Sequence, residues 1–243
     1  MNTINRALGA MVIAAVVLGV IFGGYALLFA RPQDLPWTPL DLNQPPGAFT
    51  GQKISGLRDD FAECRTLLTA AGADFMVLPA IAESGGRCGY ADGVRFAGGT
   101  RDIAFSPRPP GISCPVAAGL TVFERFVVQP AAEKHFGERV VRIEHLGSYN
   151  CRRIYGRAKG DWSEHAHANA IDLAGFVLAD GTRISVERDW KGKGERAAFL
   201  RQVRNGACRL FATVLSPDYN AAHRDHFHFD QAARGALGRR ACR

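Results

Sequence analysis

The pattern of hydrophobic and polar positions separates an N-terminal apolar run from a longer globular part. Residues 7–30, ALGAMVIAAVVLGVIFGGYALLFA, contain no charged side chain. About 20 apolar residues span a bilayer as a helix. A cleaved signal peptide is the alternative, but its apolar region is usually about 7–15 residues long. We therefore predict a transmembrane anchor at 7–30 behind a cytoplasmic stub at 1–6, with a signal segment as the other interpretation.

The next segment, residues 31–53, is rich in proline and has no apolar periodicity. Such composition predicts a linker or extended arm between the membrane and a folded domain. Regular periodicity starts near Ile54. We therefore predict a single globular domain over residues 54–243.

Apolar residues recur at helical spacing in three parts of this domain, which predicts helices at 57–71, 116–136 and 195–215. Pro130 should kink or split the second helix, because proline removes a backbone donor. Strands are predicted at 140–143, at 170–178 and 182–187 around an Asp-Gly turn, and at 226–230. Residues 85–113, rich in glycine and proline, should form loops and short strands.

These helices and strands alternate without βαβ regularity, which favours an α+β fold. We expect a small antiparallel sheet with flanking helices, preceded by one transmembrane helix. The length of 243 residues, 47% of them hydrophobic, is sufficient for a sizeable core.

Cysteine usage points to an oxidising compartment. All the cysteines follow the apolar run, they are even in number, and none forms a CxxC pair. Up to three disulfides are the simplest interpretation, with buried free thiols as the alternative, and the sequence does not choose among about 15 pairings. The candidates are Cys64, Cys88, Cys114, Cys151, Cys208 and Cys242.

The formal net charge of +7 includes one basic residue in the first thirty, so residues 31–243 carry +6. A basic exported domain suits an acidic partner, such as a cell-wall polymer or anionic lipid headgroups. The same charge would also be explained by solubility alone. No nucleic-acid-binding motif occurs in the chain, so nucleic acid is not an expected partner.

Histidines gather in two short windows, SEHAHANAID and HRDHFHFD. Alternation along a strand would place His226 and His228 on one face. His165 would come from a loop and Asp172 from the strand that follows it. Two histidines and one aspartate are a suitable zinc ligand set that leaves a fourth position open. The alternative is a polar surface in which Asp172 holds a turn.

SEHAHANAID resembles the Ser-x-His-x-x-Gly-x-Ala-x-Asp motif of metallopeptidases related to D-Ala-D-Ala carboxypeptidases, murein endopeptidases and the hedgehog domain. Ala168 stands where that motif has glycine. The cysteine pattern, GSYNCR and both histidine windows together resemble the bacterial extensin-like C-terminal domain family, over most of residues 55–230. The resemblance implies a hedgehog or D-Ala-D-Ala peptidase-like fold. The motif positions that match are Ser163, His165, Ala170 and Asp172.

The resemblance also implies roles for individual residues. His165, Asp172 and His228 correspond to zinc ligands. Asp225 corresponds to a general base, with His226 as the other candidate for that role. Arg152 is similar to an arginine that positions the substrate carbonyl. Three further residues are accessory positions: Ser163, His167 and His223. Ser163 would orient its loop by hydrogen bonding.

The expected activity is metal-assisted hydrolysis by a zinc-dependent peptidase or amidase acting on the peptides of cell-wall peptidoglycan. A non-enzymatic wall-binding domain that keeps the peptidase fold is the alternative. The expected partners are peptidoglycan or another acidic wall polymer, and the inner membrane through the N-terminal helix. The domain would lie in the periplasm, anchored to the membrane or released after signal cleavage.

Overall fold

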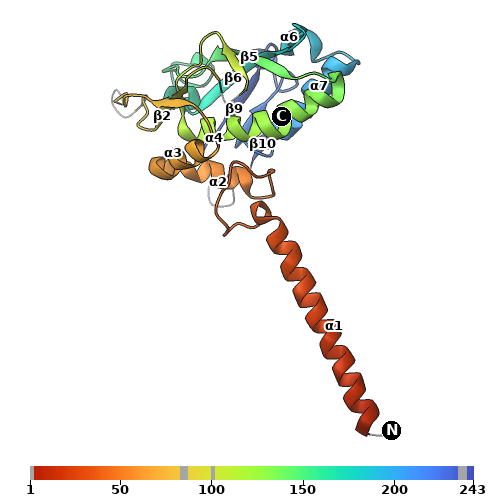
Figure 1. Ribbon diagram of the computed structural model, residues 1–243. Coiled ribbons are helices and arrows are strands. Elements are labelled where there is room, and N and C mark those ends of the chain that lie inside the picture. Colours follow the sequence, from red (N-terminus) through yellow and green to blue (C-terminus); the bar gives the residue numbers. More distant parts are fainter. Residues whose placement is uncertain (1–2, 83–86, 100–101, 235–239) are drawn as a thin grey trace.

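The computed structural model describes residues 3–82, 87–99, 102–234 and 240–243. Helix α1 (Thr3–Ala30) extends away from the rest of the chain (Figure 1). Within it, the exposed segment Arg6–Tyr25 is long and apolar enough to cross a membrane. A signal sequence near an N-terminus has the same properties. The N-terminal apolar helix is therefore confirmed, as either an anchor or a signal segment.

The predicted linker, residues 31–53, makes close contact with the domain. It begins with a 3-10 turn, and its leucines Leu40 and Leu42 join the hydrophobic core. The Asn43 side-chain amide donates to the Ala70 carbonyl at 3.1 Å. Helix α2 (Thr50–Gly56) starts inside this segment. Proline therefore limits regular structure here without preventing burial.

Two of the predicted helices are divided. The region 57–71 holds a 3-10 turn and then α3 (Phe61–Ala70), because the Asp60 side chain caps α3 by accepting from the Glu63 backbone N–H at 2.8 Å. The region 116–136 holds α4 (Cys114–Phe123), a π-helical segment and α5 (Gln129–Phe136). Pro130 lies in the first turn of α5, where its missing donor costs little.

The prediction of one helix over 195–215 is wrong in its second half. Helix α7 (Glu195–Ala207) ends early, and β8 (Thr213–Leu215) pairs with β9 (Phe227–Asp230). The apolar residues after α7 are buried by strand pairing and loop packing, which periodicity did not distinguish from a helix. Likewise, the predicted strand 182–187 is β7 (Arg183–Ser185) followed by α6 (Val186–Asp189).

The main sheet has seven strands, and its order is β10-β8-β9-β6-β5-β3 with β7 also pairing β6. The pairs β3·β5 and β8·β10 are parallel, so the sheet is larger and more mixed than the small antiparallel sheet predicted. The α+β class itself is confirmed. The other strands of this sheet are β3 (Ala104–Ser106), β5 (Val140–Gly147), β6 (Ala170–Leu178), β9 (Phe227–Asp230) and β10 (Ala241–Cys242).

A second, antiparallel sheet falls in and near the region predicted as loops and short strands. Its order is β1-β2-β4. Residues 85, 86, 100 and 101 of that predicted region lie outside the described residues. The strands of this sheet are β1 (Phe75–Val77), β2 (Gly93–Phe96) and β4 (Ile112–Ser113).

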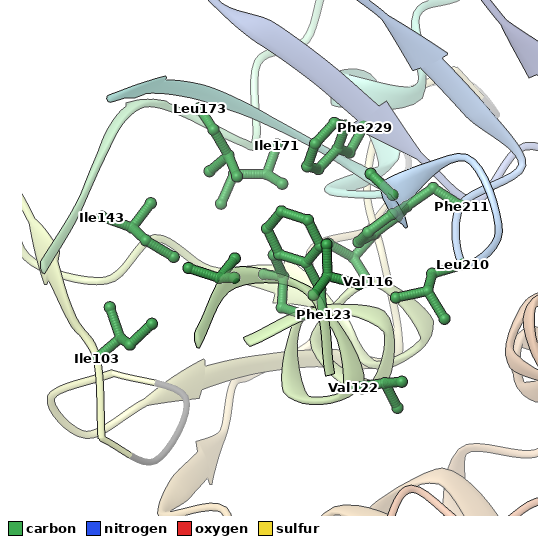
Figure 2. Packing of buried hydrophobic residues seen from close by; sticks show 14 of the residues in the cluster. Ile103, Val116, Val122, Phe123, Ile143, Ile171, Leu173, Leu210, Phe211 and Phe229 are labelled. Atoms are coloured by element: carbon green, nitrogen blue, oxygen red, sulfur yellow. The ribbon is translucent and has the colours of Figure 1, made fainter. Parts of the chain in front are cut away.

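One face of the main sheet packs against α4, as Figure 2 shows. All ten residues of α4 are buried, and all but Thr121 are apolar or small, as expected for a helix enclosed by a core. Alternate residues of β6 and β9 reach it, including Ile171, Leu173 and Phe229. The residues between them, including Asp172 and His228, point to the opposite face.

Three disulfides use all six cysteines, as predicted. One joins α3 to the start of α4, one joins the loop before β2 to the loop after β5, and one joins the end of α7 to β10. The pairs are Cys64–Cys114, Cys88–Cys151 and Cys208–Cys242.

Candidate metal centre

The three predicted ligands come from neighbouring elements. Asp172 on β6 and His228 on β9 are direct register partners in the antiparallel pair. His165 lies in a 3-10 turn (Glu164–His167) just before β6. All three side chains are largely buried. The fold therefore brings together residues that are 63 positions apart in the sequence.

The atoms that face one another are His165 Nε2, His228 Nδ1 and the two Asp172 carboxylate oxygens. The two nitrogens are 3.1 Å apart. Asp172 Oδ2 is 3.2 Å from the His165 nitrogen, and Asp172 Oδ1 is 3.0 Å from the His228 nitrogen. One ligand atom from each residue lies within 4.8 Å of the others.

The spacing of these atoms is near that of neighbouring ligands around a tetrahedral zinc ion. Zinc–nitrogen and zinc–oxygen bonds of about 2.0–2.2 Å at tetrahedral angles put two ligand atoms roughly 3.3 Å apart. The separations of 3.0 to 3.2 Å are close to that edge, although the distance to His165 is from Asp172 Oδ2 and the distance to His228 is from Oδ1. With one oxygen chosen, the three ligand atoms lie within 4.8 Å of one another. The donor set, two imidazoles and one carboxylate, is also one that zinc accepts.

The outer nitrogen of each histidine has a hydrogen-bond acceptor. His165 Nδ1 donates to the Ser148 carbonyl at 2.6 Å. His228 Nε2 donates to Asp230 Oδ2 at 3.1 Å. These bonds fix the tautomers that leave the two inner nitrogens able to bind a metal. Sequence reasoning missed Asp230, although its place two residues after His228 on a strand puts it on the same face.

Without a metal, the charges of the cluster interact directly. Burial acts to raise the pKa of Asp172, but its contacts with the His165 and His228 rings outweigh it and hold that pKa well below its usual value. Burial acts to lower the pKa of His228, but its bonds to Asp172 and Asp230 raise it to about 9. In the metal-free protein a proton on His228 therefore supplies the positive charge that the carboxylates require.

His226 lies between the cluster and Asp225. Its Nε2 is 3.5 Å from Asp172 Oδ1, and its Nδ1 donates to Asp225 Oδ1 at 2.9 Å. His226 lines the cavity described below, whereas Asp225 is not among its lining residues. Strand β9 starts at Phe227, after both residues. The geometry therefore favours His226 over Asp225 as the group that faces a substrate.

His223 lies beside this pair. Its Nδ1 donates to Asn220 Oδ1 at 2.8 Å, and its ring centroid is 5.2 Å from that of His226. Burial and the neighbouring histidines lower the pKa of His223 to about 4, so it is neutral at pH 7. His167 has a different environment: its Nδ1 donates to the Gly89 carbonyl at 3.3 Å, and it does not line the cavity.

The loop that carries His165 is held by local contacts. The Ser163 hydroxyl accepts from the His165 backbone N–H at 3.4 Å and caps the 3-10 turn. Ala168, at the position where the resembling motif has glycine, has a φ of 54°, in the left-handed region. Glycine adopts that region more readily than alanine. The backbone of this turn thus gives a physical reason for the motif's glycine.

A cavity of about 490 Å³ opens over the cluster. Arg152 lines it, and its carbonyl accepts from the Ser163 N–H at 3.2 Å. Three aromatic side chains also line the cavity: Tyr155, Trp162 and Tyr219. The Tyr155 hydroxyl accepts from the Asn220 amide at 2.9 Å. The cavity has room for several residues of a peptide chain.

Comparison with family models identifies the family. The model described as extensin-like protein C-terminus matches residues 62–243, so the chain belongs to the extensin-like C-terminal family. The match covers every residue of the cluster and all six cysteines. Comparisons with curated proteins and with solved structures find no match.

Proposed function

We propose that this protein is a zinc-dependent peptidase or amidase that acts on the peptides of cell-wall peptidoglycan. The observation that carries the proposal is the buried cluster of His165, Asp172 and His228, whose ligand atoms lie within 4.8 Å of one another and whose outer imidazole nitrogens are both engaged. A bound zinc ion would supply Lewis-acid activation of water and of the scissile carbonyl.

His226 is the general base of this proposal. Its Nδ1–H is held by Asp225, which leaves Nε2 directed toward the cluster. That nitrogen takes a proton from the attacking water and returns it to the leaving amine. Asp225 is then a positioning residue that fixes the imidazole tautomer. Arg152, on the cavity wall, orients the substrate through its guanidinium.

We also propose a fold similar to that of the hedgehog and D-Ala-D-Ala peptidase group, and a periplasmic location. A histidine before a strand, an aspartate within it and a histidine on the paired strand resemble the arrangement expected for the hedgehog and D-Ala-D-Ala peptidase group. Three disulfides require an oxidising compartment. With α1 retained as an inner-membrane anchor, the domain lies in the periplasm, next to an acidic wall polymer that suits its positive charge.

The test uses the full-length chain in non-ionic detergent, loaded with zinc and incubated with purified peptidoglycan, with and without chelator. Mass spectrometry of the released fragments identifies any bond that is cut. We expect about one zinc per chain and chelator-sensitive release of fragments. His165→Ala should lose the zinc and the activity together. Zinc binding without any hydrolysis would instead support the wall-binding alternative.

Two variants separate the possible bases. His226→Ala should keep the zinc and lower the hydrolysis rate by about 10²-fold or more, the usual scale of general-base catalysis. Asp225→Asn should keep the zinc and cause a smaller loss, because the imidazole remains in place. If His226→Ala stays active while Asp225→Asn loses activity, the base is Asp225. Arg188→Gln on α6, outside the cavity lining, is the matched surface control.

A further inference from the structure

The floor of the cavity is one face of four adjacent strands, β6, β9, β8 and β10. Asp172 pairs with His228, and His228 with Leu215, across the first three strands. Thr213 on β8 pairs with Ala241 on β10. Cross-strand partners share a face, and all five of these residues line the cavity. The floor therefore continues beyond the metal cluster to the edge of the sheet.

The distance from the metal cluster to β10 along this floor follows from the strand spacing. Neighbouring strands are about 4.8 Å apart, so β8 and β10 lie roughly 5 and 10 Å from β9. An extended peptide advances about 3.3–3.6 Å per residue. A chain lying across the strands from the cluster to β10 would therefore place about two or three residues on this floor.

Two arginines stand at this end of the cavity, and both line it. Arg234 Nε donates to the Thr213 hydroxyl at 3.1 Å, which fixes its side chain over β8. Arg243 continues β10: its N–H donates to the Val214 carbonyl at 2.9 Å, and its own carbonyl accepts from the Ser216 N–H at 2.7 Å.

The charge of Arg243 reaches the cavity wall. The pKa of Tyr219, another lining residue, is raised chiefly by its hydrogen bond with Tyr155, and the positive charge of Arg243 opposes that rise. Arg243 and Tyr219 thus line the same cavity.

The acidic residues of the cavity are already engaged. Asp172 and Asp230 contact the histidines of the cluster. Glu164 accepts from the Asn169 amide at 2.5 Å. Within the described part of the chain, no Asp or Glu side chain lies at ion-pair distance from Arg234 or Arg243. The positive charge at the β10 end is thus available to a ligand.

We propose that Arg234 and Arg243 form a carboxylate-binding subsite that recognises an acidic group on a peptide two to three residues from the metal cluster. The inference rests on the proposed function for the class of ligand, a wall peptide. The binding of a carboxylate by these two arginines does not depend on hydrolysis at the metal cluster. A guanidinium binds a carboxylate through paired N–H donors, which gives both affinity and orientation.

The test measures binding by the full-length chain in non-ionic detergent, treated with chelator so that neither metal nor hydrolysis contributes. Calorimetry compares a peptidoglycan stem tetrapeptide that has free carboxylates with the same peptide after amidation. We expect the free acid to bind at least about ten-fold more tightly, as one charge-assisted hydrogen bond provides. The double variant Arg234→Gln/Arg243→Gln should lose this preference, while Arg188→Gln should keep it.

The double variant Arg234→Lys/Arg243→Lys guards against loss of folding, because it removes the same guanidinium contacts but keeps the charge. It should regain only part of the preference, because lysine keeps the positive charge but lacks the paired donors. The proposal is overturned if the wild type does not distinguish the two peptides, if the glutamine pair keeps the preference, or if the lysine pair restores none of it. Failure of the proposed function would appear separately, as absence of hydrolysis by the zinc-loaded wild type.

Discussion

The two faces of strands β6 and β9 carry opposite chemistry on the same backbone. On β9, Phe227 and Phe229 point into the core, where Phe229 stacks on Phe211 with a centroid distance of 4.8 Å. His228 and Asp230, between and after them, point into the cavity and bond each other. A strand of four residues thus serves both the hydrophobic core and the candidate metal centre.

The difference shows how the site is kept rigid. Apolar burial on one face contributes about 25 cal/mol per Å² and holds the strands in register. The polar face contributes little net stability of this kind, because buried charges lose hydration. The core face therefore sustains a cluster on the other face that would not hold its own geometry. Changes on the two faces should have separable effects.

The largest expected effect is a loss of stability, and a matched pair of leucines, one on each face, tests it. Leu173 on β6 is fully buried against the core, whereas Leu215 on β8 is half-buried on the cavity face. Leu173→Ala should lower the free energy of unfolding by about 2–5 kcal/mol, the usual cost of a core cavity. Leu215→Ala should cost about 1 kcal/mol or less, because its site is already open to water.

Denaturant unfolding of the zinc-free protein measures both losses. A circular dichroism spectrum of each variant checks that the native fold is retained before unfolding. Equal losses for the two leucines would contradict the division of roles between the faces.

The next largest effect should be the pH dependence of zinc binding. It should arise from His228, on the cavity face. The pKa of His228 is raised to about 9, so zinc must displace a proton at neutral pH. Zinc affinity should therefore rise about ten-fold per pH unit between pH 7 and 9 and then level off. Competition with a chelator of known pH dependence measures it, and a flat profile would remove His228 from the ligand set.

The same raised pKa has a consequence for the metal-free protein. Its unfolded-state value is about 6.5, so the stability that protonated His228 contributes is present below that pH and is lost as pH rises through about 9. Unfolding measurements between pH 6 and 10, with chelator present, should show this decline. Leu173→Ala should shift the whole curve down without changing its shape.

Asp230→Asn should have a somewhat smaller effect, on the metal rather than on the fold. Its carboxylate holds His228 Nε2–H at 3.1 Å and accepts from the Ala232 N–H at 3.0 Å. Loss of such an outer partner typically lowers metal affinity about 10- to 100-fold. Asn has nearly the same shape, so unfolding of the metal-free protein gives the control. Unchanged zinc affinity would show that Asp230 does not orient the ligand.

Local sequence pattern indicated three residues that the fold brings together, whereas it placed the ends of several helices and strands wrongly. The ligand candidates were accessible from sequence because alternation on β9 and the motif at His165 each restrict where a side chain points. The register that makes Asp172 and His228 partners is a long-range property, which spacing alone does not determine. The disulfide pairing depends on the same long-range packing, as Cys208–Cys242 illustrates.

The errors also have physical causes. The residues after Ala207 are apolar enough to extend α7, but they are buried by pairing with β9, which no local signal indicates. The segment 31–53 has a linker-like composition, yet Leu40 and Leu42 supply enough apolar surface to pack on the domain. Asp230 was overlooked because a carboxylate that supports a ligand lacks a motif of its own.

Ser163→Ala should give the smallest effect and distinguishes the metal mechanism from a nucleophilic serine. The Ser163 hydroxyl accepts one weak hydrogen bond, from the His165 N–H at 3.4 Å, and caps a single 3-10 turn. Loss of such a cap costs about 0.5–1 kcal/mol of stability. If the serine only orients the loop, the variant should keep its zinc and retain hydrolysis within a few-fold of wild type. If activity disappears while zinc and stability remain, the hydroxyl takes part in the chemistry, and the assignment of His226 as a base for water must be replaced.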